Sequence, residues 1–161
     1  MEVDKNWTVL EQVCYPEIPV LTVIDMGIIR AVNKLDTAAY EIVITPTYSG
    51  CPAMDMIAVD IKSVLQDNGY NSVSVRTVLS PAWTSDWLSE SGKQKMKAYG
   101  IAPPQGTVLD KNELFAKAKM VACPQCNSSS TKLLSQFGST ACKAMYQCLD
   151  CKEPFDYFKC H

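Results

Sequence analysis

The sequence Thr45-Pro46-Thr47-Tyr48-Ser49-Gly50-Cys51-Pro52 decides how the first part of the chain is built. It follows a β-rich segment and precedes a stretch whose apolar residues recur at the three-and-four spacing of one helical face. Asn68-Gly69 then supplies a helix stop signal. The spacing therefore predicts a helix that begins at Ala53, directly after a loop with one cysteine, and buries Met54, Ile57, Ala58, Ile61, Val64 and Leu65.

Cys51 stands at the start of this predicted helix. Proline is favoured at the first helical position, which places Pro52 there and Cys51 at the N-cap. Free backbone N–H groups and the positive end of the helix dipole then face the sulfur and favour the thiolate, while Gly50 permits a tight turn. We therefore expect an exposed, reactive thiol. The alternative is a small apolar residue buried under a turn, as free cysteines often are.

The segments around this helix predict a small mixed sheet. Residues 27–34 and 39–45 are β-rich and separated by a hairpin-length connection, and residues 72–78 alternate with a period of two. Because the third strand is reached through a helix, the sheet requires a crossover, and we expect helices on one of its faces. The predicted fold class is α+β.

Two further helices and one loop complete this expected domain. Asp4 is a candidate cap for an N-terminal helix that ends before Pro16. The two prolines between Tyr15 and Val20 predict an extended loop outside the central sheet. A later helix is expected to begin at Thr84 or Ser85 and to end at Gly100.

Breaker-rich sequence at Ile101–Gly106 predicts a domain boundary. We expect a first domain over residues 1–102, a connector over 103–121 and a second domain over 122–161. Leu109 to Met120 is a candidate short helix within the connector.

The second domain is predicted from two Cys-x-x-Cys pairs separated by 21 residues. Each pair can aim two sulfurs at one ion, and together they complete a tetrahedral four-thiolate site. Strands expected at residues 131–137, 144–147 and 155–158 make this a zinc ribbon with one structural zinc. Iron in the same site and a redox Cys-x-x-Cys are the alternatives. The predicted ligands are Cys123, Cys126, Cys148 and Cys151.

Composition narrows the class of protein. The 161 residues carry a net charge of −2, and no apolar run approaches the length of a membrane span. From Cys123 onward the chain has four lysines and three carboxylates, and a four-thiolate zinc site adds a charge of −2. The net charge of the second domain is therefore negative, and we expect no nucleic-acid or membrane partner. Eight cysteines without a signal-like start indicate metal ligands or reactive thiols in the cytoplasm. Three residues have no assigned site: Cys142, Cys160 and His161.

Four motifs together resemble the MIP18 family of iron–sulfur assembly factors: Pro16-Glu17-Ile18-Pro19-Val20, Asp25-Met26-Gly27, the Cys51 loop, and Pro81-Ala82-Trp83-Thr84-Ser85-Asp86-Trp87. This resemblance covers residues 1 to 102. With the tail motifs, the whole chain is similar to the D-subunit family of bacterial phenylacetyl-CoA epoxidase. The chain departs from the MIP18 pattern at Tyr15, where that family usually has aspartate. The tail motifs are Phe137-Gly138-Ser139-Thr140-Ala141-Cys142-Lys143 and Glu153-Pro154-Phe155-Asp156-Tyr157-Phe158-Lys159.

The resemblance implies an accessory protein that assembles or maintains iron–sulfur clusters or iron in partner proteins. The expected partners are the reductase and oxygenase components of the epoxidase in phenylacetate degradation. Epoxidation itself is not expected, because the single histidine is the last residue and no Glu-x-x-His pair is present. The alternatives are a scaffold that docks partners through the ribbon and the Trp83/Trp87 segment, and a thiol enzyme acting on an acyl-CoA.

The resemblance also implies a transfer site at Cys51. A cubane cluster needs four protein ligands and this domain offers one obvious thiolate, so transient binding and handover are expected. A homodimer or a complex with the reductase would supply the missing ligands. Capping of loops and helices alone would explain the carboxylates. The polar surround expected for iron or a cluster at Cys51 consists of Glu17, Asp25, Thr47 and Asp86.

Overall fold

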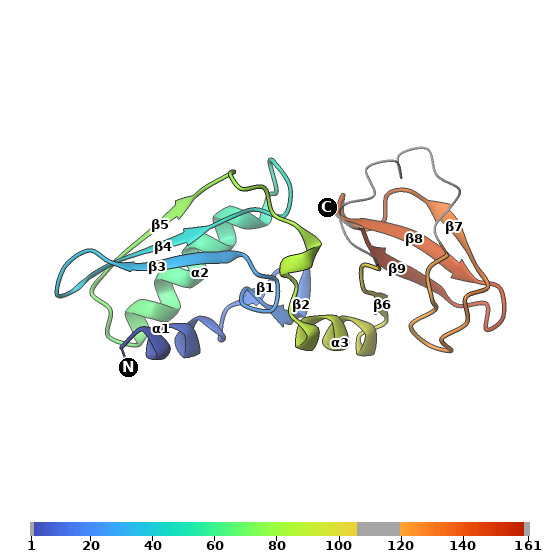
Figure 1. Ribbon diagram of the computed structural model, residues 1–161, viewed down its shortest axis with the longest axis horizontal. Coiled ribbons are helices and arrows are strands. Elements are labelled where there is room, and N and C mark those ends of the chain that lie inside the picture. The colour runs from blue at the N-terminus through green and yellow to red at the C-terminus, as the bar shows by residue number, and fades with distance from the viewer. Residues whose placement is uncertain (1, 106–119, 160–161) are drawn as a thin grey trace. The chain divides into compact units, whose positions relative to one another are not determined.

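The computed structural model describes residues 2–105 and 120–159, which form two compact units (Figure 1). Of the described residues, the first unit holds 2–83 and 87–92, and the second holds 84–86, 93–105 and 120–159. No helix in the described ranges is long and apolar enough to cross a membrane.

A three-stranded mixed sheet forms the centre of the first unit. Strands β3 (Ile29–Lys34) and β4 (Ala39–Ile44) form an antiparallel hairpin, and β5 (Ser72–Thr77) lies parallel to β4. The order is β3-β4-β5, with α2 (Ala53–Asp67) making the crossover between β4 and β5 (Figure 1). The mixed sheet and the α+β class predicted from the sequence are confirmed.

Helix α2 buries the face that the apolar spacing predicts. Ile57, Ile61 and Leu65 are inaccessible or nearly so, and α2 packs against β5. The helix ends at the predicted stop, where Gly69 takes a φ of +90°, a conformation that costs a residue with a Cβ about 1–2 kcal/mol.

The N-terminal helix differs from its prediction. Helix α1 covers Glu2–Leu10 and packs against α2. The expected cap at Asp4 is wrong, because the helix begins two residues earlier. The helix also ends well before Pro16, because the chain turns into β1 (Cys14–Tyr15).

Residues 14–22 form a separate two-stranded antiparallel hairpin. Strand β1 pairs with β2 (Ile18–Thr22), and Pro16-Glu17 lie in the connecting turn. The segment is extended and outside the central sheet, as its prolines predict, but its backbone groups pair with each other instead of forming an open loop.

The helix expected between Thr84 and Gly100 is broken in two. A short 3₁₀ helix, η1 (Ser85–Trp87), precedes α3 (Glu90–Ala98). The side chain that caps α3 is that of Ser89, whose Oγ accepts the Gly92 N–H at 2.8 Å. The predicted end at Gly100 is confirmed, with a φ of +94°.

Gly27 is a position where only glycine fits. Its φ is +63°, and a Cβ added there would lie 2.5 Å from the backbone oxygen of Trp87. The close approach brings the turn after β2 against the residues that precede α3.

The second unit contains a four-stranded sheet of order β6-β9-β8-β7. Three of its strands match the predicted ribbon strands: β7 (Thr131–Ser135), β8 (Lys143–Cys148) and β9 (Pro154–Phe158). The fourth, β6 (Ile101–Ala102), pairs in parallel with β9. The boundary expected at residue 102 stays a prediction. The candidate helix from Leu109 to Met120 lies outside the described residues except for Met120. The buried cluster of this unit consists of Ala102, Val121, Cys123, Ala144, Tyr146, Cys148, Phe155 and Tyr157.

Candidate functional site

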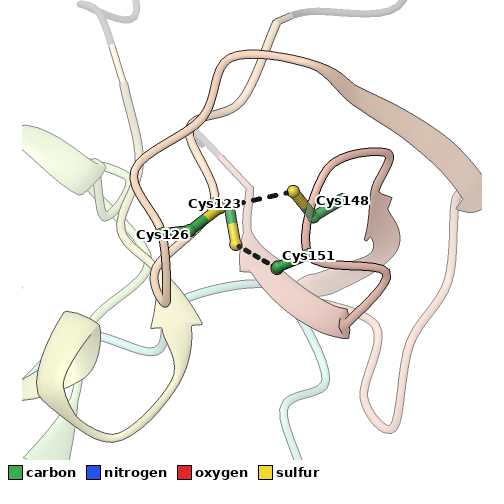
Figure 2. Close-up of side chains that lie close together, drawn as sticks. All are labelled: Cys123, Cys126, Cys148 and Cys151. Carbon is green, nitrogen blue, oxygen red and sulfur yellow. Dashed lines mark hydrogen bonds between the residues drawn. The ribbon is translucent and has the colours of Figure 1, made fainter.

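The two Cys-x-x-Cys pairs converge on one point in the second unit. All four sulfurs lie within 4.8 Å of one another. The pairs face each other across the cluster, with 3.7 Å between the sulfurs of Cys123 and Cys151 and 3.5 Å between those of Cys126 and Cys148 (Figure 2). These separations are far longer than a disulfide bond of about 2.05 Å, and all four cysteines are free.

The backbone forms a similar turn around each pair. Asn127 and Lys152 each directly follow the second cysteine of a pair, and both have a positive φ, of 61° and 68°. In the first turn the Asn127 N–H also returns to the Cys123 carbonyl at 2.9 Å. These turns aim successive sulfurs and backbone N–H groups inward, as a four-thiolate metal site requires.

Neighbouring thiols of the cluster shift the pKa values of Cys148 and Cys151. Burial opposes ionisation of Cys148, but backbone N–H groups of Cys151 and Asp150 and the neighbouring thiols outweigh it and lower the Cys148 pKa to about 7. The backbone N–H of Glu153 favours the Cys151 thiolate, but burial and the other three thiols outweigh it and raise the Cys151 pKa to about 12. One ionised sulfur is therefore stabilised at the expense of its neighbours, and a divalent cation would remove that competition.

The sulfur positions fit a tetrahedral ion. Metal–sulfur bonds of about 2.3 Å at the corners of a tetrahedron separate the sulfurs by about 3.8 Å. The two separations of 3.5 and 3.7 Å are close to that value, and the remaining sulfur–sulfur pairs lie within 4.8 Å. A zinc ion would therefore require those remaining separations to contract by about 1 Å at most.

Cys51 is buried in the structure. Only 6% of the Cys51 surface is exposed to solvent, so the expectation of an exposed thiol is wrong. Pro52 occupies the N-cap of α2, and Cys51 lies one residue earlier, with its carbonyl accepting the Met54 N–H at 3.3 Å. Cys51 therefore lies one residue before the N-cap position that the sequence predicts for it.

The hydroxyl group of Tyr15 lies close to Cys51 and to two other predicted site residues, Glu17 and Thr47. The Tyr15 side chain is fully buried, and its hydroxyl donates to Glu17 Oε2 at 3.1 Å. The same oxygen lies 3.4 Å from Thr47 Oγ1 and 4.0 Å from Cys51 Sγ. Thr47 Oγ1 in turn donates to Cys51 Sγ at 4.0 Å. We name the four side chains of Tyr15, Glu17, Thr47 and Cys51 the thiol cluster.

Asp25 makes a different set of contacts. Its Oδ2 accepts the Thr22 N–H at 3.1 Å, and its own N–H donates to Thr22 Oγ1 at 3.0 Å. Its Oδ1 accepts from Ser89 Oγ at 3.0 Å, while its carbonyl accepts the Ser89 N–H at 2.9 Å. These contacts attach the turn after β2 to the start of α3. Ser89 carries no motif signal, and a role for Asp25 toward iron stays a prediction.

The other singled-out residues lie in the second unit. Asp86 is exposed and donates its N–H to Thr84 Oγ1 at 3.3 Å, and its role toward iron also stays a prediction. Cys142 is buried, with its sulfur 3.0 Å from Thr140 Oγ1. Cys160 and His161 lie outside the described residues.

Comparison with known proteins assigns both parts of the chain. Residues 5–76 match the model described as "Iron-sulfur cluster assembly protein", and residues 109–159 match the "PaaD zinc beta ribbon domain". The chain is 44% identical over 159 residues to the D component of the "Putative 1,2-phenylacetyl-CoA epoxidase" of Escherichia coli (strain K12). That match covers 99% of this chain and 93% of the relative. The chain belongs to the family of phenylacetyl-CoA epoxidase D components.

The relatives of the first unit extend beyond this D-component family. A protein of Porphyromonas gingivalis (strain ATCC BAA-308 / W83) named "Fe-S protein maturation auxiliary factor" is 33% identical over 82 residues, covering 50% of this chain and 77% of the relative. A crystal structure of a DUF59 domain of unknown function from Bacillus anthracis matches with a TM-score of 0.53 and 29% identity. It covers 56% of this chain and 87% of the solved one. This chain therefore combines a match to an iron–sulfur cluster assembly domain with a match to a zinc ribbon.

Proposed function

We propose that this member of the D-component family assembles or maintains the iron–sulfur cluster, or the iron, of its epoxidase partners. The observation that carries the proposal is the match of residues 5–76 to an iron–sulfur cluster assembly domain, since that range contains the whole thiol cluster. The reductase component is the proposed recipient of a cluster, and the oxygenase component is the alternative recipient of iron. In this role the chain holds its cargo transiently and catalyses no step of epoxidation.

The transfer site is the thiol cluster, with Cys51 as its soft ligand. A cubane cluster needs four protein ligands, so one Cys51 thiolate requires further ligands from a second copy or from the recipient. Burial of Cys51 adds a condition: the residues that bury it must shift before a partner can reach the sulfur. Contact with the recipient is the step that would displace them.

The four-cysteine cluster would hold one structural zinc. Cys123, Cys126, Cys148 and Cys151 supply four sulfurs at a spacing suited to a tetrahedral ion. Bound zinc would supply folding free energy to the ribbon and no redox chemistry. The ribbon is then the part of the protein available for docking the epoxidase components.

A scaffold role without cluster transfer is the second candidate, and the burial of Cys51 favours it. The Trp83/Trp87 segment offers little free surface for docking, since Trp83 is buried and Trp87 is half-buried. Trp83 is 4% exposed and donates its Nε1–H to the Met26 carbonyl at 2.8 Å, so it belongs to the core of the first unit. The ring of Trp87 stacks against the Arg30 guanidinium, 3.6 Å from the ring centroid.

The proposal is tested by purifying the epoxidase components from cells with and without this protein. Iron and acid-labile sulfide are then counted per reductase and per oxygenase. The transfer role predicts a cluster-poor reductase, or an iron-poor oxygenase, when the protein is missing. The scaffold role predicts full metal content in separated components and loss of their association.

A further inference from the structure

Tyr15 brings a phenol oxygen to the centre of the thiol cluster from β1, a different element from the Cys51 loop. The oxygen lies 3.1 Å from a carboxylate oxygen of Glu17, 3.4 Å from the hydroxyl of Thr47 and 4.0 Å from the sulfur of Cys51. The Tyr15 and Cys51 residues are 0% and 6% exposed, and Thr47 is 3% exposed. Three buried residues and the half-buried Glu17 thus bring four polar atoms together, and these atoms are hydrogen-bonded to one another.

These separations are close to those between ligands of one metal ion. Bonds of about 2.0–2.3 Å to a first-row metal ion place neighbouring oxygen and sulfur ligands roughly 2.9–3.5 Å apart. The two oxygen–oxygen distances from Tyr15 already fall in this range. The 4.0 Å between Tyr15 and Cys51 must close by about half an ångström, which small side-chain rotations supply.

The donor types favour iron over a purely thiophilic ion. Cys51 offers one soft sulfur, whereas Tyr15 and Glu17 offer oxygens, which become hard anionic ligands when ionised. Phenolate oxygen is an established protein ligand for iron.

We propose that Tyr15 is a direct ligand for an iron ion at the Cys51 site, so that a phenolate and a thiolate hold the ion and the Glu17 carboxylate completes the set. This inference rests on the proposed function and names the ligands of its transfer site. Binding breaks the S–H bond of Cys51 and the O–H bond of Tyr15 and forms sulfur–iron and oxygen–iron bonds. Two protons pass to solvent, and the oxidation state of the ion does not change.

The test uses the full chain with its ribbon loaded with zinc, titrated under argon with ferric nitrilotriacetate. Tyrosinate bound to ferric iron gives a visible charge-transfer band and resonance-enhanced tyrosine ring vibrations, which a ligand set without tyrosine does not produce. Tyr15→Phe keeps the buried ring and removes only the oxygen. Tyr48→Phe, a change in the Cys51 loop itself, is the matched control.

The proposal expects the band in the wild type and in Tyr48→Phe, its loss in Tyr15→Phe, and iron binding weaker by about tenfold or more in Tyr15→Phe. Absence of tyrosinate vibrations from the wild type overturns it without recourse to any variant. A band that survives Tyr15→Phe, or that disappears in Tyr48→Phe alone, also overturns it.

Metal content of the partners separates this inference from the proposed function. If the tyrosinate signature is present but Cys51→Ser leaves the metal content of the reductase and the oxygenase unchanged, the ligand assignment stands and the transfer role fails. If the signature is absent while Cys51→Ser depletes the cluster of the reductase or the iron of the oxygenase, the transfer role stands and Tyr15 is not a ligand.

Discussion

Replacing Cys123 by serine should unfold the ribbon and leave the first unit intact. Cys123 is fully buried, and its sulfur lies 3.7 Å from that of Cys151. Bound structural zinc contributes roughly 10–16 kcal/mol of apparent folding free energy to a small domain. The hydrophobic core of a domain of this size supplies only about 3–5 kcal/mol. Losing one of four ligands should therefore bring the net stability of the ribbon to about zero, while residues of β3–β5 retain their own core.

Hydrogen–deuterium exchange read peptide by peptide measures this directly. Losing even about 3–5 kcal/mol of net stability makes exchange roughly 10²- to 10⁴-fold faster, so at least this acceleration is expected in β7, β8 and β9. Because β6 pairs with β9, Ile101 and Ala102 should lose protection with the ribbon, although the sequence places them in the first domain. Cys14→Ser, an exposed cysteine of the first unit, is the matched control. Unchanged protection of the ribbon, or equal loss in α2, would refute the reasoning.

Three further outcomes follow from the first unit. Alkylation near neutral pH should label exposed Cys14 before buried Cys51, and mass spectrometry showing the reverse order would mean that the cover over Cys51 opens readily. Gly27→Ala should lower the free energy of unfolding, measured in urea, by about 2–4 kcal/mol, since a left-handed conformation and a close backbone contact both oppose the methyl group. A decrease of less than about 1 kcal/mol would contradict this. The hydrogen bond with Arg76 lowers the pKa of Glu41 in the folded protein. The Glu41 carboxylate therefore stabilises the fold at pH values above its unfolded-state pKa, and this stabilisation is lost as the pH falls through its folded-state pKa. Glu41→Gln should therefore lower Tm slightly at neutral pH and not in strong acid, and a pH-independent difference would exclude the ion pair as its cause.

Local sequence predicted the elements whose causes are local. The apolar spacing from Met54 to Leu65 gave α2, and the two Cys-x-x-Cys pairs gave a cluster whose geometry needs no information from elsewhere in the chain. Alternation over residues 72–78 gave β5, and the crossover rule gave the mixed sheet. Helix α2 and strand β5 are each governed by one short stretch of chain, whereas the cysteine cluster and the mixed sheet were predicted from the spacing and order of separate segments.

Long-range contacts account for what the sequence did not predict. The helix-start argument for Cys51 considers only the neighbouring backbone, whereas Cys51 is buried and its sulfur lies 4.0 Å from the hydroxyl of Tyr15, 36 residues away. Similarly, the family resemblance groups Asp25 with Cys51, but the Asp25 carboxylate accepts a hydrogen bond from Ser89, 64 residues later in the chain. Strand β6 has only two residues, Ile101 and Ala102, directly before Pro103, and it is a strand because it pairs with β9.

The central claim is that Cys51 passes iron or a cluster to an epoxidase component. Its most direct test counts iron and sulfide per reductase, and iron per oxygenase, purified from cells in which this protein is wild type, Cys51→Ser or Cys14→Ser. The account predicts full content with wild type and Cys14→Ser, and a reductase depleted of cluster, or an oxygenase depleted of iron, with Cys51→Ser at equal protein levels. Full cluster and iron content with Cys51→Ser would contradict the transfer role and leave the protein as a scaffold.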